Sequence, residues 1–254
     1  MMSFSNHMKK LIVLTLASLV TLSAAFAQAD DHASSGPLFY GQSFGFVAED
    51  APAAVAAMDK WRNSKAGKSA PNIVVLNQNI VNGDYKSTHS VNVFHSNGAA
   101  MDASMAISRG SKGWAEFQAT MDKLAEPEWE NMYSILRAKA NEGDISSSNP
   151  VSIIFAFTVT DPAGFTAAFD TWWETSTVQN FPGNVYLGQS LASGTMAGTH
   201  FVTWVADSQG KLMDAMTALR SSKDTAEYMK AASGTRTLEA TNMSVEVKRW
   251  ANGG

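Results

Sequence analysis

The chain has no cysteine, which excludes disulfides, thiolate metal ligands and a lipid-anchored cysteine. It also has no run of basic residues, because 19 Lys and Arg stand against 23 Asp and Glu and the formal net charge is −4. We therefore expect neither a nucleic-acid-binding surface nor electrostatic docking onto an anionic membrane. Zinc-protease, serine-nucleophile, P-loop and dinucleotide motifs are missing too, so the sequence predicts no metal site and no bound cofactor.

Long apolar runs are also scarce, and the one that stands out lies near the N-terminus. Two lysines precede an apolar stretch over 11–22, and a small-x-small cleavage site ends at Ala27. This pattern is typical of a secretory signal peptide, 1–27, with an uncleaved N-terminal anchor as the alternative. Small polar residues follow at 28–37, where we expect a flexible leader. The sequence thus predicts a periplasmic or secreted protein with no membrane span in the mature chain.

What the sequence does contain is an internal repeat with an offset of 111 residues. It aligns 44–138 with 155–249 without a gap and gives 24 identities in 95 pairs. The identical positions include Phe44/Phe155, Phe46/Phe157, Asp59/Asp170, Trp61/Trp172, Gln78/Gln189, Gly83/Gly194, His89/His200, Arg109/Arg220 and Asn131/Asn242. Because the register holds through helices, turns and strands, we infer a tandem duplication with repeats at 38–140 and 150–250.

Each repeat is predicted to contain the same series of elements, β-α-β-β-α-β, which is a ferredoxin-like unit in an α+β fold. Asp residues at helix starts, Gly at hairpin turns and Ser at a helix break carry this prediction. The bounds are strands at 38–47 and 150–160, helix starts at Asp50 and Asp161, turns at Gly83 and Gly194, caps at Ser111 and Ser222, and final strands at 130–138 and 241–250.

The segment 182–230 resembles the antibiotic-biosynthesis-monooxygenase-like and stress-responsive members of the dimeric α+β barrel superfamily. It has their Pro-Gly before the second strand, a hairpin, an acidic-Ser helix start and a short helix opened by Ser. In that superfamily two units join their sheets into one barrel. The resemblance therefore implies an intrachain barrel, as a monomeric pseudo-dimer or as a homo-oligomer of such chains.

The resemblance also implies a place for ligands, because related enzymes hold substrate or haem between sheet and helices. Haem-degrading members combine an Asn on the first strand, a Trp on the third and a His on the second helix. Here the first strands lack that Asn, the helices lack His, and Trp204 has Val93 as its counterpart. A cofactor-free monooxygenase and a haem-handling enzyme are the enzymatic alternatives.

Strand alternation predicts which face the repeated polar residues occupy. His89 and Gln78 share a mostly apolar face that helices should cover, and His200 and Gln189 repeat this arrangement. The opposite face should line the barrel; it carries Ser43, Gly45, Asn77, Asn79, Ser90, Asn92, Ser244 and Glu246. A four-residue hairpin loop would pair Gln78 with His89, whereas a two-residue loop would pair it with Ser87.

Each Gln–His pair has three interpretations. It completes its own hydrogen bonds as a buried structural pair, it projects into a ligand pocket between sheet and helices, or it is exposed and without a role. The candidate binding residues for a small apolar or aromatic ligand are His89, Gln78, Phe44, Phe46, Trp61, His200, Gln189, Phe155, Phe157, Trp172 and Trp204.

Other repeated residues suggest structural roles. We expect Asp59 to pair with Arg109 and Asp170 with Arg220 between helices, with substrate-carboxylate binding by Arg as the alternative. If one half is specialised, its polar or aromatic residues without a counterpart are the candidates: His95, Tyr133 and Trp114, or Tyr186, Trp204 and Glu246. The sequence leaves three hypotheses open, namely a ligand-binding protein, an enzyme and a structural envelope protein without ligand.

Overall fold

A computed structural model describes residues 38–140 and 149–251, so the predicted signal peptide and leader lie outside the described residues. The first half (38–140) contains β1 (Phe39–Ala48), α2 (Ala51–Arg62), α3 (Lys65–Ser69), β2 (Ile73–Val81), β3 (His89–His95), α4 (Gly98–Arg109), α5 (Lys112–Leu124) and β4 (Ala125–Lys139). The second half (150–250) contains β5 (Val151–Val159), α6 (Pro162–Trp173), α7 (Ser176–Gln179), β6 (Asn184–Ala192), β7 (His200–Ala206), α8 (Gln209–Ser221), α9 (Lys223–Ala231) and β8 (Arg236–Trp250).

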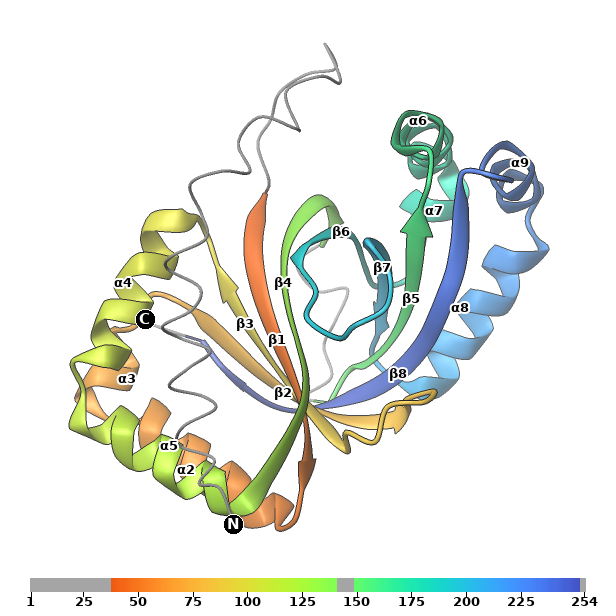
Figure 1. The fold of residues 1–254 in the computed structure, drawn as a ribbon. Helices are drawn as coiled ribbons and strands as arrows, with labels where there is room; N and C mark the ends of the chain where they lie inside the picture. The colour runs from red at the N-terminus through yellow and green to blue at the C-terminus, as the bar shows by residue number, and fades with distance from the viewer. Residues whose placement is uncertain (1–37, 141–148, 252–254) are drawn as a thin grey trace.

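The strands form one closed antiparallel barrel in the order β1-β3-β2-β8-β5-β7-β6-β4. The helices of the first half lie on one side of the barrel and those of the second half on the opposite side (Figure 1). No helix in the described part of the chain is long and apolar enough to cross a membrane. The architecture is therefore the α+β barrel that the resemblance implied.

The final strands are longer than predicted. They begin at Ala125 and Arg236, not at 130 and 241. The added residues pair with the ends of β1 and β5, for example Glu126 with Val47. Because they are mostly polar or exposed, no apolar alternation marks them in the sequence.

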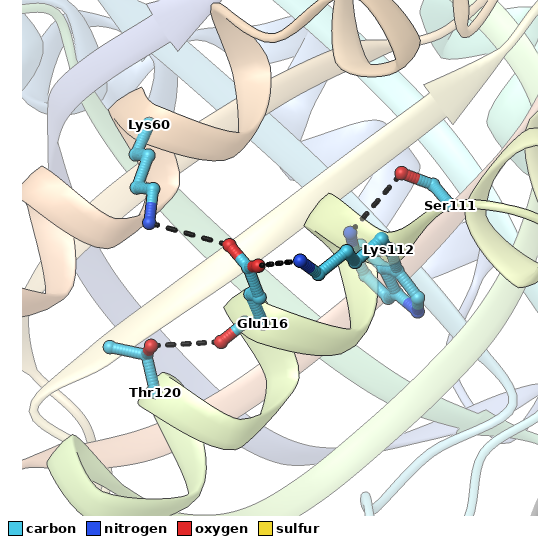
Figure 2. A network of polar contacts seen from close by, with 6 residues as sticks. Lys60, Ser111, Lys112, Glu116 and Thr120 are labelled. Atoms are coloured by element: carbon cyan, nitrogen blue, oxygen red, sulfur yellow. Dashed lines mark hydrogen bonds and ion pairs between the residues drawn. The ribbon is translucent and has the colours of Figure 1, made fainter.

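Helix caps account for where the helices begin. Asp50 accepts the N–H of Ala53 at 3.0 Å and Asp161 accepts the N–H of Gly164 at 3.0 Å, as predicted. The Ser111 hydroxyl caps α5 in the same way (Figure 2).

The ion pairs on α5 are a minor feature. Glu116 lies 3.5 Å from Lys60 of α2 and 3.7 Å from Lys112 (Figure 2). These side chains are largely exposed, so the pairs contribute little to stability. The contact between α2 and α5 rests instead on aromatic packing, with the rings of Trp61 and Trp114 5.2 Å apart.

The final strands tie the two halves together. Strand β4 pairs with β1 and with β6 of the other half, and β8 pairs with β5 and with β2. Arg137 of β4 forms two hydrogen bonds of 3.1 Å with Asp170 of α6. Lys248 of β8 lies 2.7 Å from Asp59 of α2. Since 137 and 248 also differ by 111, one inter-half ion pair occurs twice.

The predicted pairing of Asp59 with Arg109 and of Asp170 with Arg220 is therefore wrong. The carboxylates point to the other half's final strand, where a cation meets each of them. Arg220 instead places its guanidinium over the ring of Phe155, 5.9 Å from the centroid. The repeated aspartates thus stabilise the joint between halves.

The barrel-facing side carries polar residues, as expected. Ser43, Ser90, Ser244 and Glu246 are all buried there. Ser43 donates a hydrogen bond to Asn92 and is also hydrogen-bonded to the Tyr133 hydroxyl, whose pKa burial raises well above its usual value. These contacts satisfy polar groups inside the barrel.

Aromatic rings fill the middle of the barrel. Tyr133 and Phe201, from different halves, meet edge to face with centroids 5.0 Å apart. A Cβ added at Gly41 would lie 2.2 Å from the Tyr133 ring, and one at Gly188 would lie 2.1 Å from the Phe201 ring. Glycine is needed at both positions because the rings lie directly on the backbone. The middle of the barrel is therefore packed with side chains.

Candidate functional site

The hairpin register that pairs Gln with His is confirmed in both halves. Gln78 lies opposite His89, and Gln189 lies opposite His200. Across the described residues, however, neither glutamine hydrogen-bonds to its histidine. Gln78 is exposed and Gln189 is half-buried.

The threonine before each histidine holds the ring instead. Thr88 Oγ1 accepts the backbone N–H of Ala48 at 2.9 Å and lies 2.9 Å from His89 Nδ1. The hydroxyl therefore links the His89 ring to the backbone of β1. Thr199 and His200 repeat the contact at 3.0 Å. The repeated Thr-His dipeptide is thus a structural unit.

Both of these histidines sit against aromatic rings. His89 stacks on Phe46 with centroids 5.8 Å apart, and His200 lies 5.5 Å from Phe165. Burial lowers both pKa values, so the rings are neutral near pH 7. The described residues contain no group of three or more His, Asp or Glu that could hold a metal ion.

We call the side chains between the sheet and the helices of a half its sheet–helix layer. In the second half this layer is filled by large rings. Trp172 stacks on Tyr228 with centroids 4.4 Å apart, and Trp204 contacts Trp172 and Phe181 at 5.7 and 4.8 Å. The same layer buries Phe157, Phe165, Phe169, Val178, Leu212, Met216 and Leu219. The predicted candidates Phe157, Trp172 and Trp204 therefore act as packing residues.

The first-half layer has smaller side chains at the same positions. The substitutions, first half before second, are Ala54/Phe165, Met58/Phe169, Gly67/Val178, Ala70/Phe181, Val93/Trp204 and Ser108/Leu219. Trp114 and Trp250 fill part of the difference, since Trp114 packs on Trp61 and Trp250 belongs to this core. Even so, α4 buries one side chain and α5 buries none, whereas α8 buries three.

Two apolar side chains of the first-half layer are more exposed than their counterparts in the second half. Phe44, on the helix-facing side of β1, is 41 % exposed, while its counterpart Phe155 lies under Arg220. Met105 of α4 is 36 % exposed, and its counterpart Met216 is 5 % exposed. At these two positions apolar surface is therefore uncovered in the first half and covered in the second.

The first-half layer also holds buried polar side chains. His95 is 2 % exposed and Ser104 is 4 % exposed; within the described residues neither the two ring nitrogens nor the hydroxyl has a hydrogen-bond partner. Burial lowers the pKa of His95, so its ring is neutral. Ala206 and Ala215 occupy the equivalent positions. The sequence singled out His95 as a residue without a counterpart, but Ser104 was missed, although the same alignment places it opposite alanine.

Haem, which the resemblance raises as a cofactor, does not fit these residues. An axial ligand must face a space that can hold a porphyrin. The described helices carry no histidine and the second-half layer is filled. His95 is 2 % exposed on β3, against which α4 packs, so a group as large as a porphyrin could reach it only by moving that helix. The described residues therefore offer no site that fits haem.

Comparison with known proteins places the fold but no family. No family model and no curated protein matches the chain. Among solved structures, a candidate monooxygenase from Fusobacterium nucleatum subsp. nucleatum is 14 % identical with a TM-score of 0.58, over 87 % of this chain and 97 % of its own. A candidate monooxygenase from Lactobacillus acidophilus NCFM is 12 % identical with a TM-score of 0.56, over 86 % and 98 %.

A mutant chlorite dismutase from Candidatus Nitrospira defluvii is also similar, with 10 % identity and a TM-score of 0.53 over 84 % of this chain and 93 % of its own. The shared region in all three cases includes most of both halves. At these identities the similarity concerns the fold alone.

Proposed function

We propose that the protein binds one small apolar or aromatic molecule in the sheet–helix layer of its first half. The observation that carries this proposal is the contrast between Phe44 and Met105, which are exposed, and their covered counterparts Phe155 and Met216. Ligand sites are concave, mostly apolar and furnished with a few polar groups. The second-half layer, filled by aromatic rings, serves as the rigid support.

Exchanging side chains between halves tests the proposal. Ala70→Phe with Val93→Trp introduces the second-half residues into the first-half layer and should abolish binding of naphthalene, a neutral aromatic probe, in isothermal titration calorimetry. The matched control is Ile80→Gln, at an exposed strand position on the same sheet, which should leave binding unchanged. Equal binding by the filled variant and the unmodified chain would refute the proposal.

A second candidate is an enzyme that oxygenates the bound aromatic molecule without a cofactor. It is favoured by the barrel-wide similarity to two proteins described as candidate monooxygenases. Oxygen uptake measured with 2-naphthol as substrate separates this candidate from simple binding. Oxygen uptake that is lost in the Ala70→Phe, Val93→Trp variant would support the enzyme. Binding of 2-naphthol without oxygen uptake would support binding and contradict the enzyme.

We also propose that the halves arose by tandem duplication, which the shared order of elements and the recurring Asp–cation pair support. Equivalent halves should tolerate exchange of their order in the chain. A permuted protein with 150–250 before 38–140, joined by the native linker sequence, should keep the circular dichroism spectrum. Loss of cooperative folding would count against equivalence.

Export completes the proposal, because the N-terminal pattern predicts cleavage after Ala27. N-terminal sequencing of protein from a periplasmic extract should begin at Gln28. A start at Met1 in a membrane fraction would favour the uncleaved anchor.

A further inference from the structure

The first-half layer contains three buried polar atoms that lack a hydrogen-bond partner within the described residues. They are Nδ1 and Nε2 of His95 and Oγ of Ser104. Leaving such atoms unpaired is costly, and most buried polar groups in folded proteins are paired. The fold itself does not require them, because Ala206 and Ala215 replace them in the second half.

Both side chains belong to the same layer. Phe94 contacts Phe39, and Phe39 contacts Tyr186 of the other half, so Phe94 faces the barrel. His95, the next residue on the strand, therefore faces the helices. Val93, two positions earlier on the same face, packs in the first-half core.

Ser104 comes from the helical side of the layer. It is the buried side chain of α4, and α4 packs against β3. One turn before it lies Met101 and directly after it lies Met105, both with partly exposed side chains. Methionine side chains are unbranched and adaptable, so a small molecule can displace them without moving the helix.

The chemistry of the two groups defines what they recognise. A neutral imidazole offers one donor and one acceptor, and a serine hydroxyl can do both. Such a pair suits a neutral group that also donates and accepts, and a hydroxyl does both through a single atom. A carboxylate would gain no positive charge from either residue.

We infer that His95 and Ser104 hydrogen-bond the hydroxyl of a neutral aromatic alcohol, a phenol-like molecule whose ring occupies the apolar part of the first-half layer. This assignment rests on the proposed binding function and names the ligand class for that site. The aromatic ring would lie against Val93 and the methionines of α4, with the hydroxyl directed to the covered end of β3.

Two matched probes test the assignment, 2-naphthol and naphthalene, which differ by the hydroxyl alone. At pH 7.5 the unmodified chain should bind 2-naphthol about tenfold more tightly than naphthalene, the effect of about one good hydrogen bond. Ser104→Ala and His95→Leu should each weaken the binding of 2-naphthol and so bring this ratio toward one. Ser90→Ala, a buried serine on the barrel side of the same strand, should keep the tenfold ratio.

The outcomes separate this inference from the proposed function. Binding of both probes with equal affinity would overturn the hydroxyl assignment and leave the binding function standing. A tenfold ratio that survives both substitutions would overturn the roles of His95 and Ser104. Binding of neither probe would overturn both proposals. Should His95→Leu fail to fold, Ser104→Ala, which removes a single oxygen, decides the question.

Discussion

Trp204 and Val93 occupy the same strand position in the two halves, and they summarise how the halves differ. In the second half the indole is buried against Trp172 and Phe181. In the first half Val93 fills less volume than the indole does, and the apolar side chains of Phe44 and Met105 are exposed. The halves share caps, strand order and inter-half ion pairs, so the fold depends on these features and tolerates a different filling of the layer.

From this contrast we expect the second-half layer to contribute more to stability and the first-half layer to be more accessible to a ligand. A packed aromatic layer buries much apolar area and holds the barrel rigid. A partly open layer sacrifices some of that area and retains polar groups that packing does not require. The proposed binding site therefore lies where the two halves differ in sequence.

The largest expected effect comes from truncating the filled layer. Trp204→Ala should lower the free energy of unfolding by about 3–5 kcal/mol, because it leaves a cavity among buried rings. Val93→Ala, its twin, should cost about 1 kcal/mol, since the site is already partly open. Urea denaturation of both variants measures the difference, and equal losses would break the comparison.

Barrel packing should not distinguish the halves. Gly41→Ala and Gly188→Ala both push a methyl group into an aromatic ring inside the barrel. Each should cost about 1–3 kcal/mol by overpacking. Thermal unfolding that shows a large loss for one and none for the other would mean that the asymmetry extends into the barrel.

Acid should destabilise the protein through its buried histidines. Burial lowers the pKa of His89, His95 and His200, so the unfolded chain binds more protons below the unperturbed pKa of about 6.5. Stability is then full above that pH and falls as pH decreases toward the folded-state values, by at most about 1.4 kcal/mol per pH unit for each histidine. His95→Leu should reduce this slope in denaturation curves at pH 7.5 and 5.5, and an unchanged slope would contradict the burial of His95.

The smallest effect is expected at the joint between halves. Arg137→Met and Lys248→Met each remove a partly exposed ion pair and should cost no more than about 1 kcal/mol, less at high salt. Similar losses of stability in the two variants would support the equivalence of the Arg137–Asp170 and Lys248–Asp59 ion pairs. Melting temperatures at 0.05 and 0.5 M salt provide the test.

Local signals in the sequence were sufficient for most of the fold. Cap residues such as Asp50 predicted helix starts, and alternation predicted which strand face meets the helices. A four-residue hairpin loop, one of the two loop lengths considered, predicted the register of Gln78 with His89. Each of these depends on residues close together or on an identity between repeats.

The candidate site was harder to predict because its residues are those at which the sequences of the two halves differ. The Asp59–Lys248 pair joins distant segments, and the cation is Arg in the other copy, so identities alone do not reveal it. Likewise, a search for repeated histidines leads to His89, which threonine holds for structural reasons. His95 and Ser104 are identified only by looking for polar residues of the first half whose counterparts in the second half are alanine.

Methionine methyl NMR tests the central claim most directly. A titration of the mature chain with 2-naphthol should shift the methyl signals of Met101 and Met105 in the first half. The signals of Met216 and Met243, buried in the second-half core, should not move. Shifts of Met216 or Met243 equal to those of Met105 would contradict the account, because they would mean that both layers take the ligand.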